Sequence, residues 1–340
     1  MKICICGGGN LGHVVSGFLA AKGQCRVSLL TRHPNRWSRS VNVNTPDDCV
    51  LTGTIDSISD NPSSLIPDAN VVLLCLPGFA IQDELLRIKP FLMPRTAVGS
   101  VVSSTGFFFE AMKHLPPTTP LFGFQRVPFI ARVVEYGKTA SLLGFKDSLS
   151  VAIEQTEEKE SLRSLLEQLL HTPVALLSSH YEASLTNSNP LLHPARLYNL
   201  WSDWHEGVVY PSQSFFYKEW TDEASELLLA MDREFFQLLR RLPVRENCIP
   251  TILNYYESSD APSLTRKLRS IQAFKDILSP MKKVENGYIP DFASRYFMED
   301  FPYGLGIVWQ LAKKYQVNVP FIDRVMAWGR SCIELSDATV

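Results

Sequence analysis

Three glycines near the N-terminus have the spacing of a dinucleotide-binding loop. The segment Gly7-Gly8-Gly9-Asn10-Leu11-Gly12 contains the pattern Gly-x-Gly-x-x-Gly between a predicted strand and a predicted helix. Gly7 can form the tight turn, Gly9 lets a pyrophosphate approach the backbone, and Gly12 lets the helix pack close to the strand. The first N–H groups of the helix, from Asn10 and Leu11, would then face the phosphates. We therefore predict a dinucleotide site; a glycine-rich turn that binds nothing is the alternative.

The end of the second predicted strand indicates which dinucleotide is bound. A free ribose 2′-hydroxyl usually meets an acid about 20 residues beyond the glycines, but residues 30–36 contain neither Asp nor Glu. Thr31, Arg32 and Arg36 would instead suit a 2′-phosphate, because guanidinium groups form charge-assisted hydrogen bonds with phosphate oxygens. We therefore predict NADP, with NAD as the alternative. Arg32 and Arg36 could also be solvated surface charges without a ligand.

Leu76 and Pro77 lie at the end of another predicted strand, Val71 to Leu76. Open α/β sheets bind ligands beyond the carboxyl ends of their strands, so we expect these two residues near the nicotinamide end of the cofactor. A Pro-Gly turn that only ends the strand would give the same sequence.

One histidine of the second half lies in a segment suited to chemistry. Residues 189–194 read Asn-Pro-Leu-Leu-His-Pro, so that His193 lies between apolar residues and a proline. Histidine titrates near neutral pH and can pass a proton to or from a reacting oxygen or nitrogen. His193 is therefore a candidate acid or base, and a structural histidine in the core is the alternative.

A second polar cluster lies at residues 295–304. Arg295 and Glu299 have the i, i+4 spacing of an exposed helical ion pair, which is worth only about 0.3 kcal/mol. Arg295 and Asp300 would be about 140° apart on a regular helix. For both to face one site the helix must end or distort between them, and Pro302 with Gly304 would allow that distortion.

The elements that must position these residues change in type halfway along the chain. The first half alternates short β-type runs with helical periods, which predicts an α/β fold with a Rossmann-type, doubly wound sheet. Apolar residues recur with helical spacing between Leu11 and Leu19, and Gly23 is placed to end that helix. The predicted strands are Lys2 to Cys6, Arg26 to Leu30, Val71 to Leu76, Ala97 to Val102 and Leu121 to Phe124.

Helical patterns dominate after about residue 177. Before that point the sequence predicts a β-rich stretch from Val133 to Ile153, a helix from about Glu157 to Leu170 and a short apolar run. Long amphipathic segments such as Glu223 to Leu242 follow, with acids in the first turn and arginines in the last, as the helix dipole favours. We therefore predict a dinucleotide-binding domain over residues 1–178 and an all-α domain over residues 179–340.

Composition excludes several other classes of protein. The chain has 340 residues, of which 45% are apolar, and its 33 Lys and Arg against 35 Asp and Glu leave a net charge of −2. Without a basic excess we expect neither nucleic acid nor a membrane surface as a partner, and small molecules are favoured. Seven cysteines without a Cys-x-x-Cys pair argue against a disulfide framework or structural zinc. We expect a cytoplasmic protein.

The order and spacing of several segments resemble the opine dehydrogenase family, of the octopine/nopaline dehydrogenase type, along nearly the whole chain. These segments are Gly7 to Asn10, Leu76 to Gly78, Val127 to Phe129 with Arg132, Asn189 to Pro194, Phe216 to Glu219 with Asp232 to Glu234, and Arg295 to Leu305. The resemblance implies a Rossmann domain followed by a helical domain, with the active site in the cleft between them.

The resemblance also implies roles for individual residues. His193 resembles the catalytic histidine, Asp300 its carboxylate partner and Arg295 the clamp on the carboxylate of an oxo acid. Asn189 would bond to the substrate or to His193, and Gln125 and Arg132 would line the cleft. The implied reaction condenses an amino acid with a 2-oxo acid and reduces the resulting imine by hydride transfer from the nicotinamide.

Other interpretations remain open. The Thr31-Arg32 strand end differs from family members that hold NAD with an acid, and the identities of the amino acid and oxo acid cannot be read from the sequence. A ketone reductase of the ketopantoate reductase or glycerol-3-phosphate dehydrogenase type would need a lysine, which residues 178–199 lack. A non-catalytic NADP-binding sensor is a further alternative. A homodimer is expected only by analogy with the fold.

Overall fold

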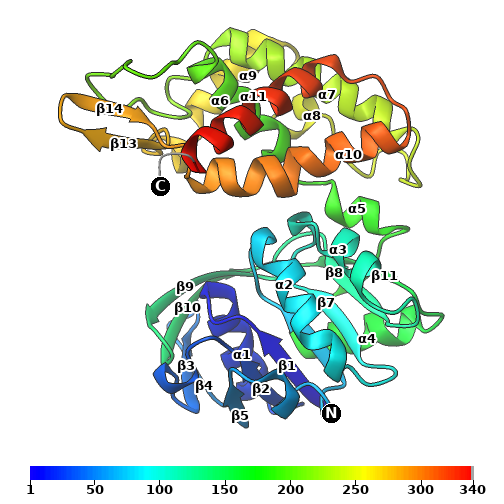
Figure 1. Cartoon of the computed structure of the whole chain (residues 1–340). Coiled ribbons are helices and arrows are strands. Elements are labelled where there is room, and N and C mark those ends of the chain that lie inside the picture. Colours follow the sequence, from blue (N-terminus) through cyan, green and yellow to red (C-terminus); the bar gives the residue numbers. More distant parts are fainter. Residues whose placement is uncertain (338–340) are drawn as a thin grey trace. The chain divides into compact units, whose positions relative to one another are not determined.

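The computed structural model describes residues 1–337 and divides the chain into two compact units (Figure 1). The first unit spans Met1–Ser184 and the second begins at Leu185. No helix in the described part of the chain combines the length and apolar character needed to cross a membrane.

The first unit is built on an eight-stranded sheet with the order β12-β11-β8-β7-β6-β1-β2-β5. Neighbouring strands are parallel except for the antiparallel pair β8 and β11. The strand order reverses at β1, which has β2 on one side and β6 on the other, as in doubly wound sheets. The strands are β1 (Lys2–Cys6), β2 (Arg26–Leu30), β5 (Ser57–Ser59), β6 (Val71–Leu74), β7 (Ala97–Ser100), β8 (Leu121–Phe124), β11 (Leu149–Glu154) and β12 (Val174–Leu176).

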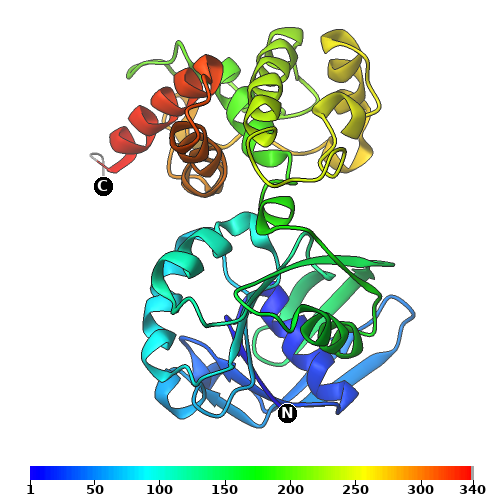
Figure 2. The same ribbon diagram turned by 90° about the vertical axis from the view of Figure 1, so that its right-hand side faces the viewer.

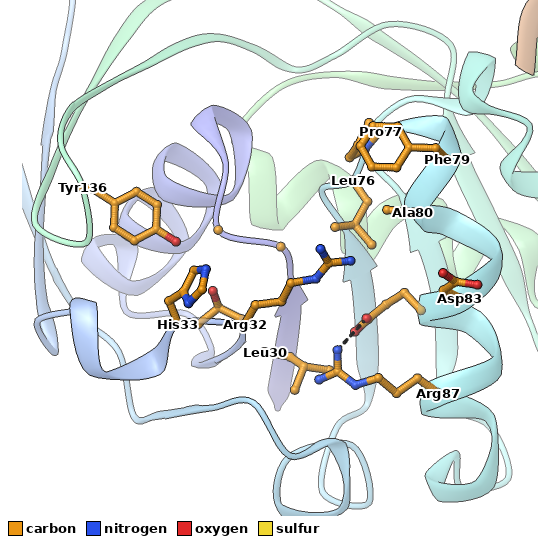
Figure 3. A pocket seen from close by; sticks show the side chains of 14 residues that line it. Leu30, Arg32, His33, Leu76, Pro77, Phe79, Ala80, Asp83, Arg87 and Tyr136 are labelled. Carbon is orange, nitrogen blue, oxygen red and sulfur yellow. Dashed lines mark hydrogen bonds and ion pairs between the residues drawn. The ribbon is translucent and has the colours of Figure 1, made fainter. Parts of the chain in front are cut away.

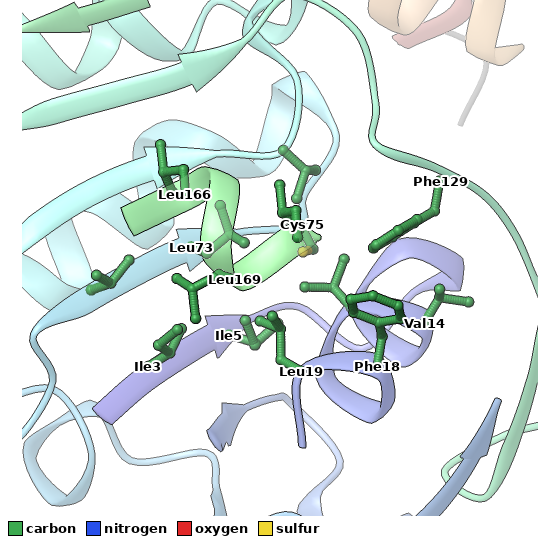
Figure 4. Packing of buried hydrophobic residues seen from close by; sticks show 14 of the residues in the cluster. Ile3, Ile5, Val14, Phe18, Leu19, Leu73, Cys75, Phe129, Leu166 and Leu169 are labelled. Carbon is green, nitrogen blue, oxygen red and sulfur yellow. The ribbon is translucent and has the colours of Figure 1, made fainter. Parts of the chain in front are cut away.

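The two faces of this sheet bury alternate residues of each strand. Ile3 and Ile5 of β1 belong to one apolar cluster, shown in Figure 4, and Cys4 and Cys6 belong to the other. Figure 2 shows α2 and α3 on one side of the sheet and α1 and α4 on the other. The helices of this unit are α1 (Asn10–Lys22), α2 (Gly78–Ile88), α3 (Phe107–His114), α4 (Lys159–Leu170) and α5 (His180–Ser184).

The sequence predictions for this unit are largely confirmed. Strands β1, β2 and β8 have the predicted bounds, whereas β6 and β7 each end two residues earlier than expected. Gly23 ends α1 in the left-handed conformation, with a φ of 67°, and its N–H donates to the carbonyl of Ala20. Short 3₁₀ turns connect the elements at η1 (Pro34–Arg36), η2 (Pro62–Ser64), η3 (Lys89–Phe91) and η4 (Ser103–Thr105).

A second sheet, of four strands, was not predicted as a separate layer. Its order is β4-β3-β10-β9, and the strands are β3 (Ser40–Asn44), β4 (Val50–Thr54), β9 (Phe129–Glu135) and β10 (Thr139–Phe145). This sheet packs on α1 so closely that a Cβ on Gly17 would lie 2.6 Å from the Val43 side chain. Its strands come from two distant parts of the chain, so that the sequence pattern alone could not pair them.

The second unit is mainly helical, which confirms the predicted fold class for this half of the chain. This unit also contains an antiparallel hairpin of β13 (Met281–Val284) and β14 (Gly287–Pro290). The sequence patterns predicted no strand there. The segment η6 (Tyr296–Leu305) is a π-helix and continues directly into α10. The other helices are α6 (Asn189–Trp201), α7 (Asp222–Leu239), α8 (Ile252–Tyr255), α9 (Ala261–Ser270), η5 (Gln272–Phe274), α10 (Gly306–Lys314) and α11 (Pro320–Asp337).

Candidate functional site

A cavity of about 460 Å³ opens at the reversal point of the large sheet, beside the glycine loop. Its walls come from the loop after β1, the end of β2, the loop after β6, helix α2 and the β9–β10 turn (Figure 3). The lining residues include Gly7, Gly8, Thr31, Arg32, His33, Leu76, Pro77, Asp83, Glu84, Arg87 and Tyr136. The volume lies within the range of small-molecule sites, and open α/β sheets bind ligands at this position.

Each glycine of the motif meets a different local requirement. Gly7 has a φ of 115°, and a Cβ there would lie 2.6 Å from the carbonyl oxygen of Cys75. A Cβ on Gly12 would lie 1.9 Å from the carbonyl oxygen of Gly7. A Cβ on Gly9 would meet no atom of the described residues within 4 Å. Gly7 and Gly12 are thus required by the fold itself, whereas the space above Gly9 is open to a ligand.

Helix α1 begins at this loop with its first N–H groups available. Gly9 is the N-cap residue, and among the described residues no side chain accepts a hydrogen bond from the first turn. The Asn10 side chain instead accepts a hydrogen bond of 2.8 Å from the backbone N–H of Val133 on β9. An uncapped helix N-terminus beside a glycine loop fits the pyrophosphate of a dinucleotide.

The residues at the end of β2 divide between the cavity and its surroundings. Thr31 is buried and lines the cavity, and the Arg32 side chain runs across it towards α2 (Figure 3). Arg36 is not among the lining residues; its guanidinium lies over the ring of Tyr136, 4.4 Å from the ring centroid. The structure thus brings Thr31 and Arg32 together at the cavity and keeps Arg36 one layer behind Tyr136.

Helix α2 contributes two acidic residues to the same cavity, and the sequence patterns did not indicate either of them. Glu84 pairs with Arg87 at 2.9 Å, and Asp83 lies beside them. Burial raises the pKa of Glu84, although Arg87 and Arg32 act in the opposite direction. Asp83 and Glu84 lie in the second turn of α2, about 50 residues beyond Arg32, so no local spacing rule points to them.

A second cluster lies in the second unit, around His193. The side chain is 10% exposed, and both of its ring nitrogens have a partner. Nδ1 lies 2.8 Å from Oδ2 of Asp300, and Nε2 lies 2.9 Å from the hydroxyl of Tyr217. A carboxylate at Nδ1 fixes the tautomer of the imidazole and stabilises its protonated form. This arrangement is typical of a histidine that exchanges protons.

The π-helix η6 explains how Asp300 reaches His193. A regular helix would place Arg295 and Asp300 about 140° apart, but η6 departs from α-helical geometry along its whole length, with Pro302 inside it. Helix α6 packs directly against η6, where a Cβ on Gly304 would lie 3.0 Å from the Pro190 side chain. Gly304 therefore permits the close approach that brings Asp300 to His193.

Arg295 and Asn189 lie close to this cluster in sequence but outside its hydrogen-bonded chain. Arg295 pairs with Glu299 at 3.0 Å, and its side chain is 81% exposed. This is the surface ion pair that the sequence analysis weighs as the alternative. Asn189 is the first residue of α6, one turn before His193 and on the same face of the helix.

Gln125 and Arg132 belong to the first unit and are not brought together. The Gln125 side chain donates a hydrogen bond of 3.1 Å to the carbonyl of Glu182. Arg132 is exposed on β9 and does not line the cavity beside the glycine loop. Among residues 1–337, no group of three or more His, Cys, Asp or Glu side chains is arranged to hold a metal ion.

The aromatic residues between positions 201 and 217 lie partly in the core of the second unit. Trp201 and Phe216 are buried, whereas Trp204, Tyr210 and Phe215 are more accessible. Tyr217 is also buried but carries the hydroxyl that reaches His193. The sequence signal for this residue was its position within one of the family-like segments, which did not reveal its partner.

Comparison with known proteins identifies the proteins that this chain resembles. Residues 176–333 match the family model described as NAD/NADP octopine/nopaline dehydrogenase, alpha-helical domain. The opine dehydrogenase of Haliotis discus hannai is 26% identical over 361 residues, covering 96% of this chain and 89% of that protein.

Solved structures show the same fold. Octopine dehydrogenase with NADH and L-arginine aligns with a TM-score of 0.85 at 24% identity, covering 98% of this chain and 90% of that one. The same enzyme with NADH and pyruvate gives 0.84 at 25% identity, with 98% and 89% covered. Yersinopine dehydrogenase with NADP⁺ aligns at 0.72 and 14% identity, with 98% and 91% covered. The helical half of the chain thus matches the octopine/nopaline dehydrogenase family model, the whole chain is similar to opine dehydrogenases, and we assign it as an NAD(P)-dependent oxidoreductase that acts on CH–NH bonds.

Proposed function

We propose that this enzyme condenses the α-amine of an amino acid with the carbonyl of a 2-oxo acid and reduces the resulting imine to a secondary amine. The observation that carries the proposal is the hydrogen-bonded pair of the buried His193 and the partly buried Asp300, which lies in the helical unit that matches the family model. Octopine dehydrogenase has been solved with an amino acid and with pyruvate, which supports the two substrate classes.

We propose that the loop from Gly7 to Gly12 holds the pyrophosphate of the cofactor. The space above Gly9 and the uncapped start of α1 support this assignment. Leu76 and Pro77, which line the same cavity, would contact the nicotinamide half. The reduced nicotinamide supplies the hydride when the cofactor is bound.

His193 is proposed as the source of the protons that the condensation requires. Loss of water from the amine adduct needs a proton on the departing oxygen, and a positioned acid typically contributes about 10²- to 10⁴-fold in rate. Asp300 stabilises the protonated imidazole through Nδ1. Because the pair is largely shielded from solvent, the interaction is stronger than it would be in water.

Arg295 is proposed as the clamp on a substrate carboxylate, with Asn189 as a further hydrogen-bonding group. The Arg295 fork is exposed, and its ion-pair partner among the described residues is Glu299, whose side chain is 20% exposed. Exposed pairs of this kind are worth about 0.2–1 kcal/mol, so a carboxylate ligand could replace Glu299 at little cost. Gln125 and Arg132 are also proposed as substrate-binding groups, as the resemblance implies.

NADP is the proposed cofactor, in preference to NAD. Arg32 extends across the cavity and provides a guanidinium for the 2′-phosphate, next to the Thr31 hydroxyl (Figure 3). Arg87 balances Glu84 on the opposite wall, which reduces the repulsion that this acid would exert on a phosphate. We expect Arg32→Gln to raise the KM for NADPH by about 10-fold or more while changing that for NADH little, since a charged hydrogen bond contributes about 1.5–3 kcal/mol.

A substrate panel tests the proposed function. The purified enzyme is incubated with NADPH or NADH, one amino acid and one of pyruvate, glyoxylate or 2-oxoglutarate, and oxidation of the cofactor is followed by absorbance. We expect oxidation only when both substrates are present, with a dicarboxylated secondary amine as the product in the mass spectrum. Equal oxidation with the oxo acid alone would indicate a ketone reductase. Tight binding of the dinucleotide without oxidation by any pair would indicate a sensor.

A further inference from the structure

Neither ring nitrogen of His193 is free to meet a substrate. Nδ1 is engaged by Asp300 and Nε2 by the hydroxyl of Tyr217. We propose that Tyr217 is a catalytic residue that passes the proton between His193 and the reacting nitrogen or oxygen of the substrate. This inference rests on the proposed function and adds the atom through which His193 acts.

The Tyr217 ring is held too firmly to be displaced by a substrate. It stacks on Phe274 of η5, with the ring centroids 4.3 Å apart and the planes 23° from parallel. It also stacks on Trp220, with the ring centroids 6.0 Å apart and the planes 12° from parallel. A substrate that bound His193 directly would have to break this stacking as well as the hydrogen bond. Transfer through the hydroxyl requires neither.

The backbone on both sides of Tyr217 is fixed by a buried arginine. Arg196 lies three residues after His193 on the same face of α6 and is only 1% exposed. Its Nε donates to the carbonyl of Phe216 at 3.0 Å, and its Nη2 donates to the carbonyl of Glu219 at 2.7 Å. One turn of helix therefore carries both the imidazole and the group that positions its phenol partner, which makes Arg196 a positioning residue.

The hydroxyl of Tyr217 keeps its proton in the resting protein. Burial raises the pKa of Tyr217 well above the usual range, and the nearby Tyr296, Tyr256 and Asp300 act in the same direction. A protonated hydroxyl can donate to Nε2 of a neutral imidazole or accept from the N–H of a protonated one. Both protonation states of His193 are therefore satisfied, as a relay requires.

The relay step is balanced in protons and electrons. The imine carbon accepts a hydride from the reduced dinucleotide, and the electron pair of the C=N bond moves to nitrogen. That nitrogen takes the proton of the Tyr217 hydroxyl, and the Tyr217 oxygen takes the proton from Nε2 of His193. The imine is reduced by two electrons and the dinucleotide is oxidised by two. His193 is left neutral, with its Nδ1–H still donated to Asp300.

The substitution Tyr217→Phe tests the relay, and Tyr296→Phe is the matched control. Tyr296 packs edge-on against the same imidazole, with ring centroids 4.8 Å apart, but its hydroxyl has no hydrogen bond to His193 in the described structure. We expect kcat to fall about 10²-fold in Tyr217→Phe, with the KM for the dinucleotide within error of wild type. Tyr296→Phe should keep kcat within about threefold. Equal kcat values for wild type and Tyr217→Phe would overturn the relay.

A proton inventory separates a relay from a structural role. In mixtures of light and heavy water, the wild-type rate should give a curved plot against the deuterium fraction, because two protons move in one step. The residual rate of Tyr217→Phe should give a straight line, because one proton remains; a curved line there would contradict the relay.

Replacement of Tyr217 by a fluorinated tyrosine covers the case in which Tyr217→Phe fails to fold. The ring and its stacking remain, and only the acidity of the hydroxyl changes, so an unchanged kcat would also overturn the relay. A wild-type enzyme that oxidises no reduced dinucleotide with any substrate pair would refute the proposed function, and the relay with it. An active wild type with an equally active Tyr217→Phe would refute the relay alone.

Discussion

Each unit has a buried histidine near the N-terminus of a helix, and the two histidines differ in their hydrogen-bond partners. His13 lies in the first turn of α1, fully buried, and His193 lies near the start of α6 with 8% of its surface exposed. His13 bonds to backbone only: Nδ1 to the carbonyl of Gly9 at 2.9 Å and Nε2 to the N–H of Gly137 at 2.7 Å. His193 bonds to a carboxylate and a hydroxyl.

The chemistry of these partners decides what each histidine can do. A backbone N–H can only donate, so Nε2 of His13 must remain an acceptor and the ring must remain neutral. Burial accordingly lowers the pKa of His13, although its bond to the Gly9 carbonyl opposes the effect. The hydroxyl and carboxylate around His193 satisfy either protonation state. His13 therefore fixes the glycine loop to the β9–β10 turn, and His193 is free to exchange protons.

The largest effect is expected from His193→Ala. Removal of the only imidazole that Asp300 contacts in the described structure should lower kcat by about 10²- to 10⁴-fold, because the proton source of the reaction is lost. Steady-state kinetics with the best substrate pair from the panel measure this, with dinucleotide affinity as the control for folding. Turnover near the wild-type rate would remove His193 from the mechanism and make it a structural histidine like His13.

Asp300→Asn should have a smaller but still large effect. The amide keeps the shape of the carboxylate but cannot stabilise a protonated imidazole, so we expect kcat to fall about 10²-fold with little change in KM. The ratio of the kcat values of the variant and wild type measures how much the carboxylate contributes to the rate. An Asp300→Asn enzyme as active as wild type would show that the pair serves stability only.

His13→Ala should lower stability rather than chemistry. The substitution leaves the buried N–H of Gly137 without its acceptor, which costs about 1–3 kcal/mol in the free energy of unfolding. Denaturant unfolding of the variant and of wild type gives this difference. An unchanged midpoint would mean that water or another group satisfies Gly137, and that His13 does not anchor the turn.

The smallest expected effect is the pH dependence of stability that His13 contributes. Its pKa is lower in the folded protein than in the unfolded chain, whose value is about 6.5. The unfolded state therefore binds more protons in this window, and stability is lost as the pH falls from about 6.5 through the lower folded pKa. In thermal melts, the midpoint of His13→Ala should decrease less with falling pH over this range than the midpoint of wild type does. Identical slopes would contradict the assignment.

The two sites were predictable from the sequence to different degrees. The glycine loop is a contiguous motif whose requirements are local: a positive φ at Gly7 and close packing at Gly12. His193 and Asp300 were paired by resemblance to a family, since nothing in their spacing of 107 residues joins them. Tyr217 lies in one of the family-like segments, but nothing there indicates its partner, and its hydroxyl acquires a role only when that partner is known.

The sequence by itself determined five neighbouring strands of the large sheet, helix α1 and the glycine loop, because backbone preferences and apolar periodicity act over a few residues. Tertiary structure decided which side chains share a proton. A hydrogen bond requires two atoms within about 3 Å in a suitable direction, and for His193 that depends on the π-helix that carries Asp300 and on the Arg196 contacts that fix Tyr217. Packing between distant segments, which no local pattern encodes, sets those positions.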